Sequence, residues 1–196
     1  MSEFGICMEG CGPSYRKWLI HATKGRTEFN YVEIGVAYGG TISGACAILA
    51  GIKGLNWKAY GIELPKGWSY EPKMVKDLIA RMEGKLEIIL KPSEEALKEW
   101  SVPIHFIMVD GCHEKDCCKL DFELLEPHVV QGGVVAFHDS GANEQGGGIQ
   151  PHHRQPVGVR QALKELNLFD GSRPGWKVLE DCVPSVEVGC FFVEKL

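Results

Sequence analysis

The chain has 196 residues, of which 44% are hydrophobic and 24% are charged, and these values are typical of one soluble globular domain. No run of residues approaches the ~18 apolar positions that a membrane-spanning helix needs, so we expect no membrane partner. The formal net charge is -5, and the basic residues are scattered among acidic ones. Because nucleic-acid binding depends on clustered Lys and Arg, a nucleic-acid partner is disfavoured. The first residues lack the order of a secretory signal, which indicates a cytoplasmic protein.

Eight cysteines are distributed over the chain without any C-x-x-C pair. In a cytoplasmic protein we expect these thiols to stay reduced. Cys46 and Cys190 lie within apolar runs, and we interpret them as small buried hydrophobic residues. A metal site at Cys7 and Cys11 is the alternative use of cysteine in this sequence.

The chain opens with a helical segment over residues 1–29 and then alternates strand-like and helix-like runs. The strand-like runs are almost continuously apolar, which favours strands that are covered on both faces of a parallel sheet. They are predicted at residues 31–36, 57–63, 85–90, 104–110 and 133–138. The helix-like runs are predicted at residues 40–52, 72–83, 93–100, 115–127 and 157–166.

Two further strand-like runs, residues 176–181 and 187–193, are separated by too few residues for a parallel crossover, so they must pair as an antiparallel hairpin. The whole pattern predicts a single domain over residues 1–196 with a Rossmann-like, doubly wound α/β fold. Its seven-stranded sheet is mostly parallel and ends in an antiparallel C-terminal hairpin. The irregular stretch at residues 140–155 is rich in Gly and His, and we interpret it as an active-site loop.

A glycine-rich turn follows the first predicted strand and precedes the first helix after it. Glycines allow a sharp turn and let the backbone approach a ligand closely. The spacing Gly35-x-x-x-Gly39 differs from the G-x-G-x-x-G of dinucleotide-binding folds. Glu33 would repel a pyrophosphate, whereas it would attract a sulfonium or an ammonium group. The turn therefore favours a cationic ligand over NAD.

Glu63 stands at the tip of the second predicted strand. A carboxylate in this place can accept hydrogen bonds from both hydroxyls of a ribose. The feature is shared by proteins that bind NAD and proteins that bind S-adenosylmethionine, so it indicates an adenosine without naming the ligand. A solvated loop acid is the alternative interpretation.

Polar residues end two strands that we expect to be neighbours, and they present Asp110, His138 and Asp139 to one crevice. Oxygen and imidazole ligands could hold a divalent metal there, and two close carboxylates need a cation to offset their repulsion. Alternatively, these groups only hydrogen-bond one another and the ligand. His113 follows Asp110 by three residues and could accept a proton near neutral pH, or it could serve to position a ligand.

The motifs follow one another in the order Glu33-x-Gly35-x-x-x-Gly39, Glu63, Asp110 with His113, and His138-Asp139. Together with the terminal hairpin, this order resembles the class I methyltransferases, and most closely the group of catechol-type and macrolide-sugar O-methyltransferases. The resemblance covers roughly residues 30–194. It implies S-adenosylmethionine as cofactor, with the glycine-rich turn around the methionine part, Glu63 at the ribose, and Ser93 and Glu94 beside the adenine. The implied cofactor-binding residues are Glu33, Gly35, Ala37, Tyr38, Gly39, Glu63, Ser93, Glu94, Asp110 and His113.

Metal-dependent members of that group coordinate magnesium through an acid that matches Asp110 and an acidic or amide pair that matches His138 and Asp139. Because His138 is a softer ligand than the usual acid, both Mg and Mn are open as the metal. Relatives place a Lys or Asp base just after the first acid, where this chain has Cys112 and His113. We assign catalytic roles to Asp110, His113 and Asp139, and metal ligation to Asp110, His138 and Asp139.

The sequence thus predicts a methyltransferase that O-methylates a small hydroxylated acceptor, sugar-like or catechol-like. An NAD-dependent oxidoreductase and a non-catalytic S-adenosylmethionine-binding protein are the alternatives. His152, His153 and Arg154 either cover the acceptor or are solvent-exposed residues of the loop. A homodimer is a possible assembly of the chain.

Overall fold

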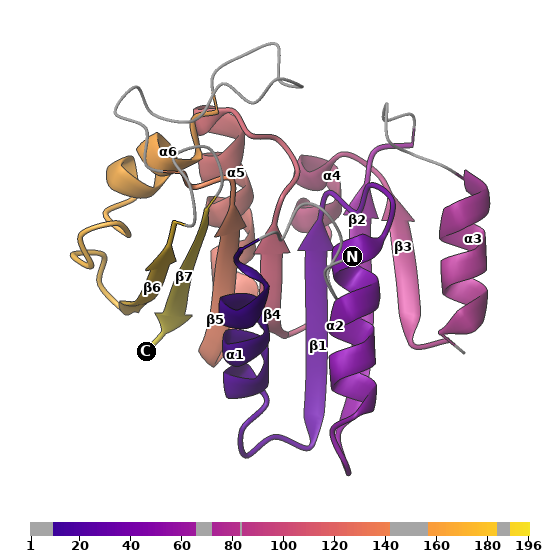
Figure 1. Ribbon diagram of the computed structural model, residues 1–196. Helices are drawn as coiled ribbons and strands as arrows, with labels where there is room; N and C mark the ends of the chain where they lie inside the picture. The colour runs from indigo at the N-terminus through magenta and orange to yellow at the C-terminus, as the bar shows by residue number, and fades with distance from the viewer. Residues whose placement is uncertain (1–9, 66–71, 83, 142–156, 184–188) are drawn as a thin grey trace.

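The computed structural model describes residues 10–65, 72–82, 84–141, 157–183 and 189–196. Seven strands form one sheet in the order β3-β2-β1-β4-β5-β7-β6 (Figure 1). The strands are β1 Glu28–Ile34, β2 Asn56–Glu63, β3 Leu86–Leu90, β4 Ile104–Val109, β5 Val129–His138, β6 Trp176–Cys182 and β7 Cys190–Lys195. Pairs among β1 to β5 are parallel, whereas β7 is antiparallel to both β5 and β6. The predicted fold class and the C-terminal hairpin are confirmed.

Helices cover both faces of the sheet. They are α1 Gly12–Ala22, α2 Gly40–Ala50, α3 Pro72–Arg81, α4 Ser93–Lys98, α5 Lys115–Leu125 and α6 Val159–Glu165, with a short 3-10 helix, η2, at Glu126–His128. α1 and α2 lie in front of the sheet, with α4 and α5 behind it (Figure 1). Each layer has its own hydrophobic core, so the central strands are buried on both sides, and every residue of β4 is buried, whereas the edge strands β3 and β6 are partly exposed. This explains the continuous apolar runs in the sequence.

The direction of winding reverses at β1, which pairs with β2 on one side and with β4 on the other. In doubly wound sheets, ligands bind at the carboxyl ends of the strands beside this reversal. The topology therefore places the ligand crevice at the ends of β1 and β4.

Several predicted boundaries differ from the structure. Residues 1–29 were predicted as helical. In the described part of this range the helix is α1, and β1 begins at Glu28, whereas residues 1–9 lie outside the described part. β5 begins at Val129, four residues before its predicted start. Gly132 and Gly133 lie inside the strand and do not precede it, and the pairing of β5 with β4 shifts its register beside them. β1 ends at Ile34, two residues early, because Gly35 turns the chain with a φ of 84°.

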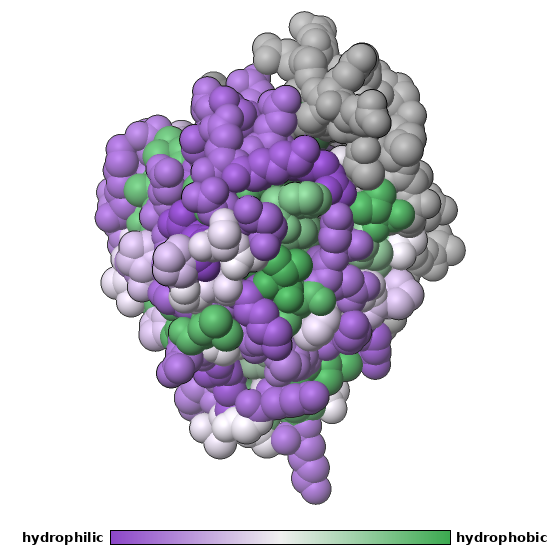
Figure 2. All heavy atoms as spheres, turned by 90° about the vertical axis from the view of Figure 1, so that its left-hand side faces the viewer, coloured by the Kyte–Doolittle hydropathy of each residue, from purple (hydrophilic) through white to green (hydrophobic). Residues whose placement is uncertain are grey.

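Among the described residues, no helix is both long and apolar enough to cross a membrane. The face of the molecule on the β6 side carries mainly hydrophilic side chains, with small separated apolar groups (Figure 2). The described part of this face therefore lacks the broad apolar area that obligate dimers bury.

Candidate active site

The glycine-rich turn connects β1 to α2 through three residues with positive φ: Gly35 at 84°, Ala37 at 47° and Gly39 at 76°. Gly39 is the N-cap of α2 and provides no side-chain capping hydrogen bond. The first N–H groups of the helix have no partner within the helix itself, and one of them, the N–H of Ile42, donates to the buried carboxylate of Glu33.

Gly35 has a packing role in addition to the close approach to a ligand that the sequence predicts, which stays a prediction. A Cβ atom at this position would lie 2.1 Å from the backbone oxygen of Asp110 and 2.6 Å from its carbonyl carbon. The Asp110 N–H donates a hydrogen bond to the Ile34 oxygen at 2.9 Å. The glycine thus allows the ends of β1 and β4 to meet, and it brings the turn directly against Asp110.

Glu63 supports the same turn from the end of β2. Its carboxylate accepts hydrogen bonds from the N–H of Ala37 at 2.7 Å and from the N–H of Leu64 at 2.8 Å. A carboxylate has about four acceptor positions, so capacity is left for a ligand hydroxyl. The contact of Glu63 with a ribose stays a prediction. In addition, Glu63 has a structural role, because it holds the backbone of the turn.

Glu33 lies beneath the turn and is 1% exposed. Its carboxylate accepts a hydrogen bond from the Tyr31 hydroxyl, and the Tyr31 oxygen accepts one from the Tyr15 hydroxyl at 2.6 Å. Burial raises the pKa of Glu33 to about 8, and the negative charges of Asp110 and Glu63 add to the shift. A bound cation would stabilise the ionised form, in line with the expected preference for a cationic ligand.

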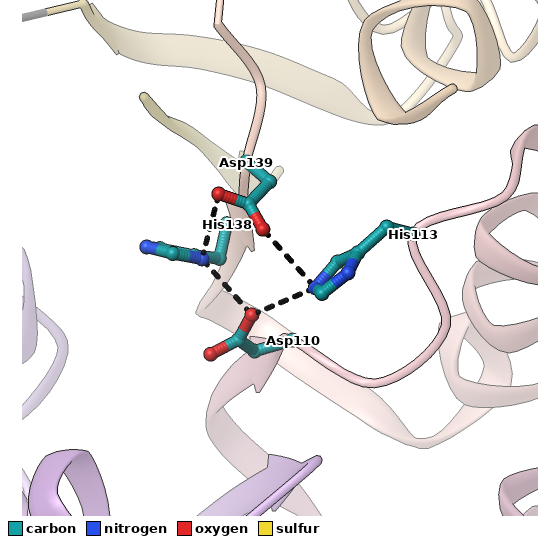
Figure 3. A group of neighbouring side chains, drawn as sticks. All are labelled: Asp110, His113, His138 and Asp139. Carbon is teal, nitrogen blue, oxygen red and sulfur yellow. Dashed lines mark hydrogen bonds and ion pairs between the residues drawn. The ribbon is translucent and has the colours of Figure 1, made fainter. Parts of the chain in front are cut away.

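The polar strand ends form one compact group (Figure 3). His138 Nδ1 lies 2.9 Å from Oδ1 of Asp110 and 3.3 Å from Oδ1 of Asp139. His113 Nε2 lies 3.2 Å from Oδ1 of Asp110 and 3.1 Å from Oδ2 of Asp139. The structure thus brings together all four predicted residues, from the end of β4, the loop after it, and the end of β5.

Electrostatics in this group are dominated by pairing of opposite charges. Burial tends to raise the pKa of Asp110, but the adjacent imidazoles, His138 foremost, lower it well below its usual range. Burial tends to lower the pKa of both histidines, yet the carboxylates raise it, strongly for His138. The imidazoles therefore supply positive charge between the two carboxylates, and the repulsion that suggested a metal is already offset.

The same four side chains also fit a metal ion. One ligand atom from each residue lies within 4.8 Å of the others. Two carboxylates and two imidazoles are a donor set that suits a divalent transition ion such as Mn²⁺ better than Mg²⁺. A metal would replace the imidazole protons as the positive charge in the group.

The start of α6 holds both loops of this group in place, which the sequence analysis did not identify. The Gly158 N–H donates to the His113 oxygen at 2.7 Å. Nε of Arg160, a residue that is 7% exposed, donates to the backbone oxygens of Ser140 at 3.0 Å and Gly141 at 3.1 Å, directly after Asp139. The signal in the sequence was an arginine among the apolar residues of a helix start.

Other predicted site residues lie away from this group or outside the described residues. Tyr38 is exposed on the glycine-rich turn. Ser93 begins α4, and Glu94 in the same turn pairs with Lys98 at 2.6 Å; their contact with an adenine stays a prediction. Of the predicted loop at 140–155, only Ser140 and Gly141 are described, so His152, His153 and Arg154 lie outside the described part.

The cysteines of the described part are all free thiols. Cys46 and Cys190 are buried in the core on the α1–α2 side, as predicted. The suggested Cys7–Cys11 metal site lies partly outside the described residues, because Cys7 precedes them.

Several solved structures have a similar fold. An O-methyltransferase from Bacillus cereus in complex with SAH has a TM-score of 0.64 at 16% identity, covering 94% of this chain and 81% of that one. The O-methyltransferase TomG from Streptomyces achromogenes, in complex with SAM, has a TM-score of 0.63 at 15% identity, with 94% and 80% covered. An rRNA methylase from Streptococcus thermophilus has a TM-score of 0.61 at 14% identity, with 93% and 95% covered. These likenesses establish a shared fold.

At the sequence level, an uncharacterized protein, y4gI, from Sinorhizobium fredii is 26% identical over 161 residues. The match covers 78% of this chain but 17% of that protein, so the chain spans about a sixth of its relative's length. The family model described as "Methyltransferase domain" matches residues 32–140, which extend from β1 to the end of β5 and include the whole polar group. The chain therefore belongs to this family of methyltransferase domains and has the class I methyltransferase fold.

Proposed function

We propose that the protein is an S-adenosylmethionine-dependent O-methyltransferase acting on a small hydroxylated acceptor, sugar-like or catechol-like. The observation that carries the proposal is the contact between the glycine-rich turn and the Asp110 group, since Gly35 packs directly on the Asp110 backbone. A donor held in the turn would present its reactive end to the polar group. The names of the two neighbours bound to SAH and SAM support the choice of cofactor.

The charge around the turn favours this donor over NAD. Glu33 lies beneath the turn and Glu63 holds its Ala37 N–H. S-adenosylmethionine carries a sulfonium and an ammonium, which these carboxylates would attract, and a ribose whose hydroxyls need an acceptor. A cation in the turn would favour the ionised form of Glu33, whereas a pyrophosphate in the same place would disfavour it and would meet the carboxyl group of Glu63 as well.

The polar group would activate the acceptor. In methyl transfer the acceptor oxygen attacks the methyl carbon in line, the sulfur–carbon bond breaks, and the hydroxyl proton must leave. Once His113 has lost its own proton, its imidazole could take the proton of the hydroxyl, and the two carboxylate neighbours would stabilise the imidazolium that forms. A divalent ion held by Asp110, His138 and Asp139 would acidify the same hydroxyl. The remaining task of the protein is to hold donor and acceptor in line.

The test is a turnover assay on the purified chain with S-adenosylmethionine and a panel of catechols, hydroxylated sugars and a structured RNA. We expect S-adenosylhomocysteine to form with at least one small acceptor and mass spectrometry to show an O-methyl group in the product. Methylation of the RNA alone would contradict the small-molecule acceptor, and we include it because one structural relative is an rRNA methylase.

Calorimetric titrations with S-adenosylmethionine and with NAD separate the alternatives. Tight NAD binding without S-adenosylmethionine binding would overturn the proposal in favour of an oxidoreductase. S-adenosylmethionine binding without turnover on any acceptor would favour a non-catalytic binding protein. A cytoplasmic location and a homodimer stay predictions.

A further inference from the structure

A second group of potential metal ligands lies beside the active-site loop and is not used by the proposed reaction. Cys112 is in the loop after β4, Glu114 is the N-cap residue of α5, and Cys117 lies in the first turn of that helix. One ligand atom from each residue lies within 4.8 Å of the other two. Both thiols are partly accessible and the carboxyl group is exposed. A metal could therefore enter this group from solvent.

The spacing suits a tetrahedral site. Zinc binds thiolate sulfur at about 2.3 Å and carboxylate oxygen at about 2.0–2.2 Å, which places two ligand atoms of one ion about 3.5–3.8 Å apart. The group in the structure therefore needs to contract by about 1 Å at most, which side-chain rotation can supply. A water molecule would complete the four ligands.

Glu114 is available for this role because it does not cap its helix. Its backbone is extended, at φ −73° and ψ 145°, and its side chain makes no capping hydrogen bond. A residue at this position commonly gives its side-chain oxygen to the first turn. Here the carboxylate lies with the two thiols.

The Cys117 thiol is protonated in the absence of a metal, so a bound cation must displace its proton. Burial raises the pKa of Cys117 to about 12, with further contributions from the Cys112 thiol and the negative charges of Glu114 and Asp121. Asp121 is 2% exposed, and its Oδ2 has no hydrogen-bond partner among the described residues. These acids disfavour a thiolate at Cys117, and a bound divalent cation would reverse that preference.

We propose that Cys112, Glu114 and Cys117 form a binding site for a thiophilic divalent cation of the zinc class. Its two sulfur ligands distinguish it from the oxygen and nitrogen donors of the Asp110 group, so we expect it to prefer softer metals. The proposal does not depend on methyl transfer, because it concerns binding alone. Since Cys112 precedes His113 directly, the bound cation would fix the His113 loop to the first turn of α5.

Titration of the reduced, full-length chain with Cd²⁺ tests the site, because cadmium–thiolate bonds give a charge-transfer absorption that oxygen and nitrogen ligands do not. We expect one equivalent of Cd²⁺ to produce this absorption. Cys112→Ser and Cys117→Ser should each abolish it and weaken that binding event at least about 100-fold, beyond the usual cost of losing a supporting residue. Glu114→Gln should keep the absorption and bind about tenfold more weakly.

Cys182→Ser is the matched control, because Cys182 is also a half-buried thiol and lies near another cysteine: Cys11 Sγ donates to its backbone oxygen at 3.7 Å. This variant should bind Cd²⁺ as the wild type does. Three results would each refute the site. They are absence of the absorption from the wild type, its persistence in Cys112→Ser and Cys117→Ser, and its loss in Cys182→Ser. Should a variant fail to fold, cadmium NMR on the wild type decides, since its shift distinguishes two sulfur ligands from none or three.

Discussion

Replacing Gly35 with alanine tests whether the contact between β1 and Asp110 builds the active site. The added Cβ would lie 2.1 Å from the Asp110 oxygen, at a backbone φ of 84°. Left-handed backbone costs a non-glycine residue about 1–2 kcal/mol, and overpacking costs about 1–3 kcal/mol. We therefore expect Gly35→Ala to lower the free energy of unfolding by about 2–5 kcal/mol, the sum of these two costs.

Gly25→Ala is the matched control. Gly25 has a φ of 71°, and a Cβ there would have no atom within 4 Å. It should therefore show the backbone cost alone, about 1–2 kcal/mol. Urea denaturation at constant m-value gives both numbers. Calorimetry should show that Gly35→Ala also weakens S-adenosylmethionine binding, because relief of the overlap must move the turn or Asp110.

The reasoning would be refuted if Gly35→Ala were no less stable than Gly25→Ala. That result would mean that the strand ends separate without cost. Equal stability together with a selective loss of cofactor affinity would return the glycine to its sequence-based role, which is close approach to the ligand.

Three further predictions follow from the site. Nη2 of Arg160 also pairs with Oδ2 of Asp181 at 2.8 Å. Arg160→Met should cost about 1–3 kcal/mol in urea denaturation, because the oxygens of Ser140 and Gly141 lose a donor, and it should lower kcat more than cofactor affinity. A loss no larger than that of Asp181→Asn, which weakens this ion pair alone, would contradict this. The pKa of Glu33 is raised to about 8 in the folded protein. The free energy of unfolding of the wild type should therefore fall relative to that of Glu33→Gln as pH rises from about 4.5 to 8, by up to about 1.4 kcal/mol per pH unit. Equal pH dependence of the two free energies would exclude this effect. If His113 is the base, His113→Gln should lower the rate by about two to four orders of magnitude; a small loss with unchanged pH dependence would assign proton removal to a metal-acidified hydroxyl.

The fold was predictable because its main signals are local. Continuous apolar runs mark strands buried on both faces, and the short connection before the last strand permits only an antiparallel hairpin. The predicted start of β5 was wrong because we interpreted Gly132 and Gly133 as a strand boundary. In the structure the pairing with β4 continues across them with a shifted register, which depends on the neighbouring strand.

The site was predictable where residues share a strand end, and it was missed where they meet only through packing. Asp110, His138 and Asp139 follow directly from two parallel strands that end at one edge. Tyr15 reaches Tyr31 from α1, on another layer of the fold. Arg160 reaches back to Ser140 across 20 residues of sequence. No short pattern encodes these contacts, because each depends on how a helix docks on the sheet.

The four side chains of the polar group suit two alternative functions, metal binding and proton transfer, and both stay predictions. From the sequence we expected a cation between the carboxylates of Asp110 and Asp139. In the structure the imidazoles of His113 and His138 lie beside these carboxylates. An imidazole proton and a divalent ion are alternative partners of the same carboxylate oxygens, so metal binding must displace protons. Because the carboxylates raise the pKa of both histidines, that displacement becomes easier as the pH rises. If this group binds a divalent ion, we expect its affinity to increase with pH, in the same direction as the expected capacity of His113 to act as a base.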